Sequence, residues 1–208
     1  MKLMTKLLAA TALLAATQAN AAPVVIDFAS AAWVGANNQT DFKVGIATAT
    51  AGPAGATLWV DSTDGMGVRG FKEIDEIDRQ EYLEVTFDQV VTLDSILLTD
   101  FFDKDKDGGD GSTLFGEKGY LSLWLDGAEI VGSPLEFFGI NSDQVNGTQT
   151  ISGGYVKVDM IKFYTTGIND DFSVNLIKYD VPESGMAVLL SLGLMGLGLS
   201  RRRQAKKA

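Results

Sequence analysis

An apolar residue alternates with a polar one through Leu83-Glu84-Val85-Thr86-Phe87-Asp88. A similar period of two recurs in Leu121-Ser122-Leu123-Trp124-Leu125 and in Val156-Lys157-Val158-Asp159. Successive side chains of a strand point to opposite faces of its sheet. The pattern therefore predicts strands that bury one face and leave the other outside.

Apolar runs bounded by turn residues extend this pattern over residues 22–180. We expect further strands at 24–28, 42–50, 57–61, 90–99, 161–165 and 172–179, and a two-residue hairpin turn at Asp126-Gly127. Many short strands separated by turns predict an all-β fold, an antiparallel β-sandwich of jelly-roll-like type.

Residues 1–21 have the form of a secretory signal peptide helix. Lys2 and Lys6 precede an apolar run at 7–16, and Ala19-Asn20-Ala21 is the small-x-small pattern that signal peptidase cleaves. A short amphipathic helix of the folded domain is the alternative, but the apolar run has no polar face. We expect cleavage after Ala21 and export of the chain.

The other end, residues 181–208, contains an uncharged run at 185–200. A helix of this length spans about 24 Å, slightly less than the hydrocarbon core of about 30 Å. The cations that follow it favour a cytoplasmic C-terminus and an acidic body outside. We expect a single transmembrane helix; the alternative is a buried C-terminal helix of the domain.

Taken together, this C-terminal segment resembles the PEP-CTERM sorting signal of Gram-negative bacteria. The resemblance rests on Val181, Pro182, Glu183 and Ser184, the apolar run, and the cluster Arg201, Arg202 and Arg203. Ser184 stands where that family has the second proline of Pro-Glu-Pro. The resemblance implies an exosortase in the inner membrane as sorting enzyme, removal of the tail near residues 182–184, and a place at the cell surface or in an exopolysaccharide matrix, as in biofilm. Three stretches, Gly65-Met66-Gly67-Val68, Glu76-Ile77-Asp78 and 81–87, are also similar to a passage in the β-sandwich bodies of such proteins.

Composition excludes several classes of function. The chain has no Cys and no His, so disulfides, thiol chemistry and imidazole catalysis are excluded. Residues 22–180 hold ten cations and 26 anions, a net charge of −16 that repels nucleic acid and attracts divalent cations. No pair of carboxylates is singled out for glycoside hydrolysis, and we expect a protein that is not an enzyme.

One acidic segment has the spacing of a calcium loop. Asp103-Lys104-Asp105-Lys106-Asp107-Gly108 places carboxylates at relative positions 1, 3 and 5 and glycine at 6, as in the first half of an EF-hand. Leu114 at position 12 and the strand-like flanks exclude an EF-hand. We expect Ca²⁺ in a loop between two strands, with ligands Asp103, Asp105, Asp107, Asp110 and Glu117. The alternative is a solvated acidic loop without an ion.

Two further groups are weaker candidates. Asp75, Glu76, Asp78 and Glu81 favour a solvated loop leading into a strand, with a second ion or a sugar hydroxyl as the alternative. The tryptophans are candidates for stacking on sugar rings. We expect Trp59 in the core. Trp124 is out of phase with its leucine neighbours, so it faces either outward, as a candidate carbohydrate contact, or toward a second layer of the fold.

These features predict an exported, non-enzymatic cell-surface or exopolysaccharide-matrix protein with a structural calcium loop. A calcium-dependent carbohydrate-binding module is the alternative, and a glycan-active hydrolase is a third hypothesis. The expected partners are signal peptidase, an exosortase-type enzyme, the inner membrane during transit and an exopolysaccharide, with nucleic acid excluded.

Overall fold

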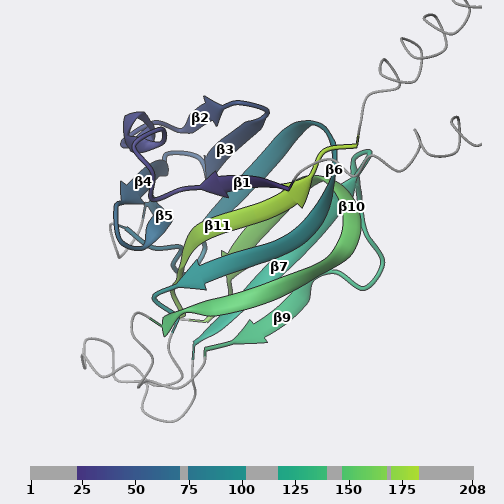
Figure 1. Cartoon of the computed structure of the whole chain (residues 1–208). Coiled ribbons are helices and arrows are strands. Elements are labelled where there is room, and N and C mark those ends of the chain that lie inside the picture. Colours follow the sequence, from purple (N-terminus) through teal and green to yellow (C-terminus); the bar gives the residue numbers. More distant parts are fainter. Residues whose placement is uncertain (1–22, 71–74, 102–116, 140–146, 168–169, 183–208) are drawn as a thin grey trace, which may run out of the picture. The chain divides into compact units, whose positions relative to one another are not determined.

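Two long strands, β6 (Tyr82–Thr99) and β10 (Gln149–Thr165), organise the fold by pairing antiparallel along most of their length. Their register shifts between Val158 and Met160 of β10, where residues 87–90 of β6 lie opposite residue 159. Figure 1 shows both strands curving strongly along their length. Each strand therefore contributes one half to each of two layers.

The first layer is built on the starting half of β6 and the final half of β10. β3 pairs with β6 on one side, and β7 pairs with β10 on the other. The sheet is extended by β2 next to β3 and by β8 and β9 next to β7. The bounds of these strands are β2 Asp41–Val44, β3 Ala47–Gly52, β7 Lys118–Leu125, β8 Ala128–Glu129 and β9 Leu135–Phe138.

The second layer is built on the other halves of the two long strands. β11 (Ser173–Asp180) pairs with β6, and β1 (Val24–Asp27) pairs with β11. The hairpin of β4 (Thr57–Asp61) and β5 (Gly65–Arg69) joins β11 through the pair Val174 and Met66. A single turn of 3₁₀ helix, Val34–Ala36, precedes β2.

The inner face of these strands forms the core. Leu83, Val85 and Phe87 are buried in one half of β6, and Ile96 and Leu98 are buried in the other half. The buried phase shifts by one residue near Asp94, where the register with β11 also shifts. Each fully buried side chain of this size stabilises the fold by about 1.5–3 kcal/mol. The predicted all-β antiparallel sandwich is confirmed.

The structure, a computed structural model, describes residues 23–70, 75–101, 117–139, 147–167 and 170–182 (Figure 1). Pro23–Asp180 forms one compact unit. The predicted signal peptide, the predicted transmembrane helix, the calcium ligands Asp103 to Asp110 and all of the sorting signal except Val181 and Pro182 lie outside the described residues. Within the described residues, no helix is long and apolar enough to span a membrane.

Several strand predictions need correction. The runs 156–159 and 161–165 belong to one strand, β10, because the register shift near Val158 does not end it, and β9 is a further strand that the pattern did not predict. The run 42–50 is two strands, because Gly45 adopts φ +60° and turns the chain between β2 and β3. The runs 83–88 and 90–99 are one strand, because β6 bends without ending. Residues 65–69 form an unforeseen strand, in which Gly67 allows close contact: a Cβ there would lie 1.8 Å from the carbonyl oxygen of Asp75.

The predicted two-residue hairpin turn is confirmed. Asp126 and Gly127 connect β7 to β8, and both have positive φ, as a two-residue turn of this kind requires. The turn fixes which residues of β7 face outward, since register in a hairpin follows from the turn.

Candidate functional site

A row of aromatic residues crosses the outer face of the first layer. Tyr82 of β6 pairs with Tyr164 of β10, which pairs with Tyr120 of β7. Tyr120 pairs in turn with Glu136 of β9. All four lie outside because their neighbours along each strand are directed toward the core.

Most of this row is engaged in contacts within the protein. The rings of Tyr120 and Tyr164 stack with centroids 5.3 Å apart and planes 16° apart. Lys162 Nζ lies 3.6 Å from the centroid of Tyr82 and 3.0 Å from Glu84 Oε1. Cross-strand contacts of these kinds stabilise a sheet. They also occupy ring faces that a ligand would otherwise use.

The β9 end of the row is different, and we call Lys118, Tyr120, Glu136 and Phe138 the edge patch. Lys118 is the cross-strand partner of Phe138, as Tyr120 is of Glu136, so the four side chains share the outer face. Phe138 is 54% exposed, whereas the preceding Phe137 is 6% exposed. The chain therefore presents one of two consecutive aromatic rings to solvent.

Hydrogen bonds and an ion pair hold the polar side chains of the edge patch in place. Lys118 forms an ion pair with Glu136, and the Tyr120 hydroxyl donates to Glu136 Oε1 over 3.1 Å. Lys118 Nζ also lies 5.3 Å from the centroid of Phe138 and 5.6 Å from that of Tyr120. The hydrogen bond with Glu136, followed by that with Tyr120, raises the pKa of Lys118, and the bond with Lys118 lowers the pKa of Glu136. Both groups are ionised at neutral pH.

The edge patch has the chemistry of a carbohydrate contact. The exposed face of an aromatic ring carries negative quadrupolar charge and attracts the C–H face of a sugar ring. The adjoining carboxylate accepts hydrogen bonds from hydroxyl groups, and the ammonium group donates them. Nothing in the sequence analysis singled out these four residues, although Phe137-Phe138 in a strand requires one of the two rings to face outward.

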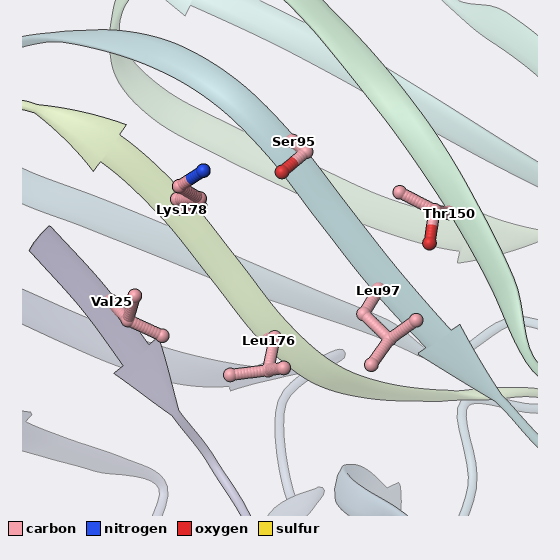
Figure 2. Close-up of a pocket in the computed structure, with 6 residues that line it drawn as sticks. All are labelled: Val25, Ser95, Leu97, Thr150, Leu176 and Lys178. Carbon is pink, nitrogen blue, oxygen red and sulfur yellow. The ribbon is translucent and has the colours of Figure 1, made fainter. Parts of the chain in front are cut away.

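Two shallow depressions lie elsewhere on the described surface. One, on the outer face of the second layer, has a volume of about 200 Å³. Figure 2 shows the residues that line it: Leu97 and Leu176 lie between Val25, Ser95, Thr150 and Lys178. The other, of about 250 Å³, lies between the β8–β9 connection and the register shift between Ser152 and Val156 of β10, and includes Leu123, Ile130 and Leu135. Both are smaller than the sites of about 300–1,000 Å³ that usually hold small molecules.

The three tryptophans occupy different environments. Trp33 is buried in the core against Phe28, with ring centroids 4.9 Å apart. The prediction that Trp59 belongs to the core is wrong: it lies on the opposite face of β4 from Leu58 and Val60, half-buried, with the Arg69 guanidinium 3.7 Å from its ring centroid. Side chains of β4 alternate between the two faces of the strand, so Trp59 points outward, and the Arg69 guanidinium covers its ring.

Trp124 faces outward from β7, in the phase expected from the sequence. It is half-buried, and its Nε1 is buried with no hydrogen-bond partner in the described part of the chain. Six residues of strand separate it from Lys118, or about 20 Å, so it does not join the edge patch. Its role as a carbohydrate contact stays a prediction.

The acidic residues fall into two regions. The proposed calcium ligand Glu117 is buried immediately before β7, and its carbonyl oxygen accepts a hydrogen bond from the Gly139 amide over 2.8 Å. The other four proposed ligands are outside the described residues. Among the residues that the structure describes, no group of three acidic side chains is arranged to hold a metal ion.

The prediction that residues 75–81 form a solvated loop is wrong for Asp78 and Glu81, each 1% exposed. Ile77 is buried, and its amide donates to the Phe172 carbonyl over 2.8 Å, which draws the segment against the core. The Asp78 amide donates to Glu81 Oε2 over 3.2 Å. Packing of Ile77 thus carries both acids inward.

A separate carboxyl pair lies at the end of β6. Burial, followed by the charges of Asp64 and Asp75, raises the pKa of Asp100 to about 7. Burial and the charge of Asp61 also raise the pKa of Asp64. The β4–β5 turn that carries Asp64 is held in place because the Thr99 hydroxyl donates to the Asp64 carbonyl oxygen. In the sequence, Asp100 stands two residues before the segment 102–116, which contains the predicted calcium ligands.

Comparison with known proteins gives only distant similarities. No family model matches the chain, and no curated protein matches its sequence. The wild-type discoidin II of Dictyostelium discoideum is 15% identical over 79% of this chain and 56% of its own, with a TM-score of 0.36. This chain thus spans little more than half the length of discoidin II.

Two smaller domains are similar over more of their length. The family 32 CBM of C. perfringens NanJ, solved in complex with galactose, is 15% identical over 78% of this chain and 96% of its own, with a TM-score of 0.34. GH31 CBM32-2, solved bound to GalNAc, is 12% identical over 76% and 95%, with a TM-score of 0.31.

Replacing Asp100 by Asn should alter the pH dependence of stability. With its raised pKa, folded Asp100 keeps a proton that the unfolded chain loses near the ordinary aspartate pKa of 3.8. The free energy of unfolding of the wild type therefore falls as pH rises from about 4 to about 7, and the Asn variant lacks this fall. Above about pH 7 the variant should be more stable, by on the order of 1 kcal/mol after allowance for solvent screening.

Urea unfolding across this pH range, in the presence of a chelator, measures the effect. Asp41→Asn, a change at an exposed acid of β2, serves as the control. Parallel pH profiles for the wild type and the Asp100 variant would contradict the raised pKa of Asp100.

Proposed function

We propose that this chain is an exported carbohydrate-binding β-sandwich whose glycan site is the edge patch. The observation that carries the proposal is the exposed ring of Phe138 beside the hydrogen-bonded group of Lys118, Glu136 and Tyr120. Six large apolar side chains are exposed among the described residues, and Phe138 is the aromatic one. Exposure of a large apolar ring next to ordered polar groups is typical of a ligand surface.

Each member of the edge patch has a role in this proposal. Phe138 stacks on the apolar face of a sugar ring, and the carboxylate of Glu136 accepts hydrogen bonds from its hydroxyl groups. Glu136 Oε1 already receives the Tyr120 hydroxyl, which holds the carboxylate in one orientation. Tyr120 is itself held by its stack on Tyr164. Such preorganisation lowers the entropy lost on binding.

Binding without catalysis fits the composition of the edge patch. Hydrolysis of a glycoside ordinarily uses two carboxyl groups about 5–10 Å apart on either side of the scissile bond. The edge patch contains a single carboxylate, and that carboxylate is paired with a lysine. We therefore propose a binding module rather than a hydrolase.

The proposal includes the cellular location that the two ends of the sequence imply. The N-terminal segment directs export, and the PEP-CTERM-like segment is recognised by an exosortase-type enzyme during transit through the inner membrane. The mature protein is then released to the cell surface or the exopolysaccharide matrix, where glycans are abundant. We also propose that the signal peptide and the predicted transmembrane segment are helical, and that the strands of the sandwich follow a jelly-roll-like order.

A structural calcium ion is the last part of the proposal. The acids of 103–110 alternate as calcium ligands do, and Glu117 immediately precedes β7. Calcium would supply positive charge to a strongly acidic body. The ion would stabilise the connection between β6 and β7 rather than contact the glycan directly.

Replacing Phe138 by Ala should weaken glycan binding about tenfold or more, because the stacking surface is lost. The fold should remain intact, since the ring is largely outside the core. A glycan array identifies a ligand, and isothermal titration calorimetry then gives Kd for the wild type and the variant. The control is Val131→Ala, a fully exposed apolar side chain on the β8–β9 connection. Equal Kd values for the wild type and the Phe138 variant would remove the edge patch as the site.

Calcium should raise the melting temperature of the purified sandwich. At a concentration about 100 times Kd, a bound ion adds about 2.7 kcal/mol, which corresponds to roughly 5–10 °C for a domain of this size. Differential scanning calorimetry with calcium and with chelator measures the shift, and Asp105→Asn should reduce it. A melting temperature unaffected by millimolar calcium would refute the calcium loop.

Sorting should remove both ends of the chain. In a host that carries an exosortase, we expect the mature protein to begin after Ala21 and to lack Arg201, Arg202 and Arg203. Intact mass spectrometry of protein from the cell surface or medium measures this directly, and a host without the enzyme is the control. A mature product that retains the arginine cluster would contradict sorting through this signal.

A further inference from the structure

We propose that the edge patch selects uncharged glycans over anionic ones, and that Glu136 sets this preference by neutralising Lys118. The inference rests on the proposed function and concerns the class of glycan that the same site accepts. Glu136 is then a specificity-determining residue as well as a hydrogen-bond acceptor.

The first argument is the charge of the edge patch itself. Lys118 is its one cation and Glu136 its one anion, and the two form an ion pair. Their interaction raises the pKa of the lysine and lowers that of the carboxyl group, so the pair stays charged and mutually compensated at neutral pH. An uncharged sugar meets hydrogen-bonding groups here without having to supply or neutralise charge.

Neighbouring lysines on the same layer are compensated in the same way. Lys162 Nζ lies 3.0 Å from Glu84 Oε1, and Lys43 Nζ lies 2.7 Å from Asp88 Oδ1. The paired carboxylate offsets the charge of each lysine, so an approaching anion meets little net positive charge at either one. These three lysines on the outer face of the layer are each paired with a carboxylate, and so they give a polyanion no uncompensated positive charge to bind.

The wider field of the protein acts in the same direction. Residues 22–180 carry a net charge of −16, which repels a polyanionic chain at low ionic strength. A uronate that paired with Lys118 would either displace Glu136 or share the ammonium group with it. In both cases the ligand carboxylate would lie close to the Glu136 carboxylate, and like charges brought together disfavour a complex.

Glu136→Gln tests the inference because it removes one charge while keeping a side chain of the same shape. Lys118 then becomes an uncompensated cation next to Phe138. We expect affinity for anionic oligosaccharides to rise about threefold to tenfold and to become sensitive to salt, whereas affinity for neutral ones stays equal or falls. Glu84→Gln, the same change in the other ion pair of the aromatic row, should leave both affinities within about twofold.

Calorimetric titrations use neutral hexasaccharides of galactose and mannose and anionic hexasaccharides of mannuronic and galacturonic acid. They are run at about 20 mM and about 300 mM salt, where the screening lengths differ severalfold. The wild type should bind a neutral hexasaccharide at least about tenfold more tightly than either anionic one, with little effect of salt. Thermal melts of each variant confirm that it is folded.

The outcomes separate the two proposals. If the wild type prefers an anionic hexasaccharide, or if Glu136→Gln leaves the ratio of anionic to neutral affinity unchanged, the inference on charge is overturned while carbohydrate binding stands. If the wild type binds none of the hexasaccharides and no glycan on an array, the proposed function and the inference fall together. If Glu136→Gln and Glu84→Gln raise anionic affinity equally, the preference comes from the overall field and not from Glu136, which also overturns the inference.

Discussion

The antiparallel pairing of β6 with β10 is the interaction on which the rest of the sandwich depends. A strand can serve two layers only if its apolar face stays on the inside as it bends. In β6 this condition is met at residues 87–90, which stand opposite a single residue of β10, and again near Asp94, where a one-residue shift restores the buried phase. Each irregularity adjusts the face that the strand presents, which is the general role of a bulge.

This geometry determines what the first layer presents to solvent. Since β3, β6, β10, β7 and β9 are in continuous register, residues at one level form a row, and the tyrosines and their partners follow from that register. The row ends at β9, which lies at the edge of the sheet. Charged residues at a sheet edge discourage pairing with another chain, and the ion pair of Lys118 and Glu136 serves that purpose whether or not a glycan is bound.

Alternation of apolar and polar residues could predict the strands because it depends on local geometry alone. It could not predict that β6 continues through 87–90, since a bend keeps the same local pattern while the direction of the chain changes. The alternation also could not predict that Asp78 and Glu81 are buried, because charged residues are usually exposed and the packing of Ile77 is a tertiary effect. Exposure of one ring of the pair 137–138 could have been predicted, because adjacent residues in a strand face opposite ways. Trp59 was misread because residue type was given more weight than its phase between Leu58 and Val60.

The charge of the whole chain and the chemistry of the edge patch fit one physical account. Under the proposed function, a strongly acidic protein outside the cell would repel acidic matrix components, so long-range attraction would not bring it to them. Under the same proposal, recognition would depend on short-range contacts: stacking on an exposed ring, and hydrogen bonds to groups held in a fixed orientation. The edge patch offers both, and its ion pair supplies donors and an acceptor without adding net charge. The same compensation that protects the sheet edge would therefore allow the protein to remain soluble among polyanions while it holds an uncharged glycan.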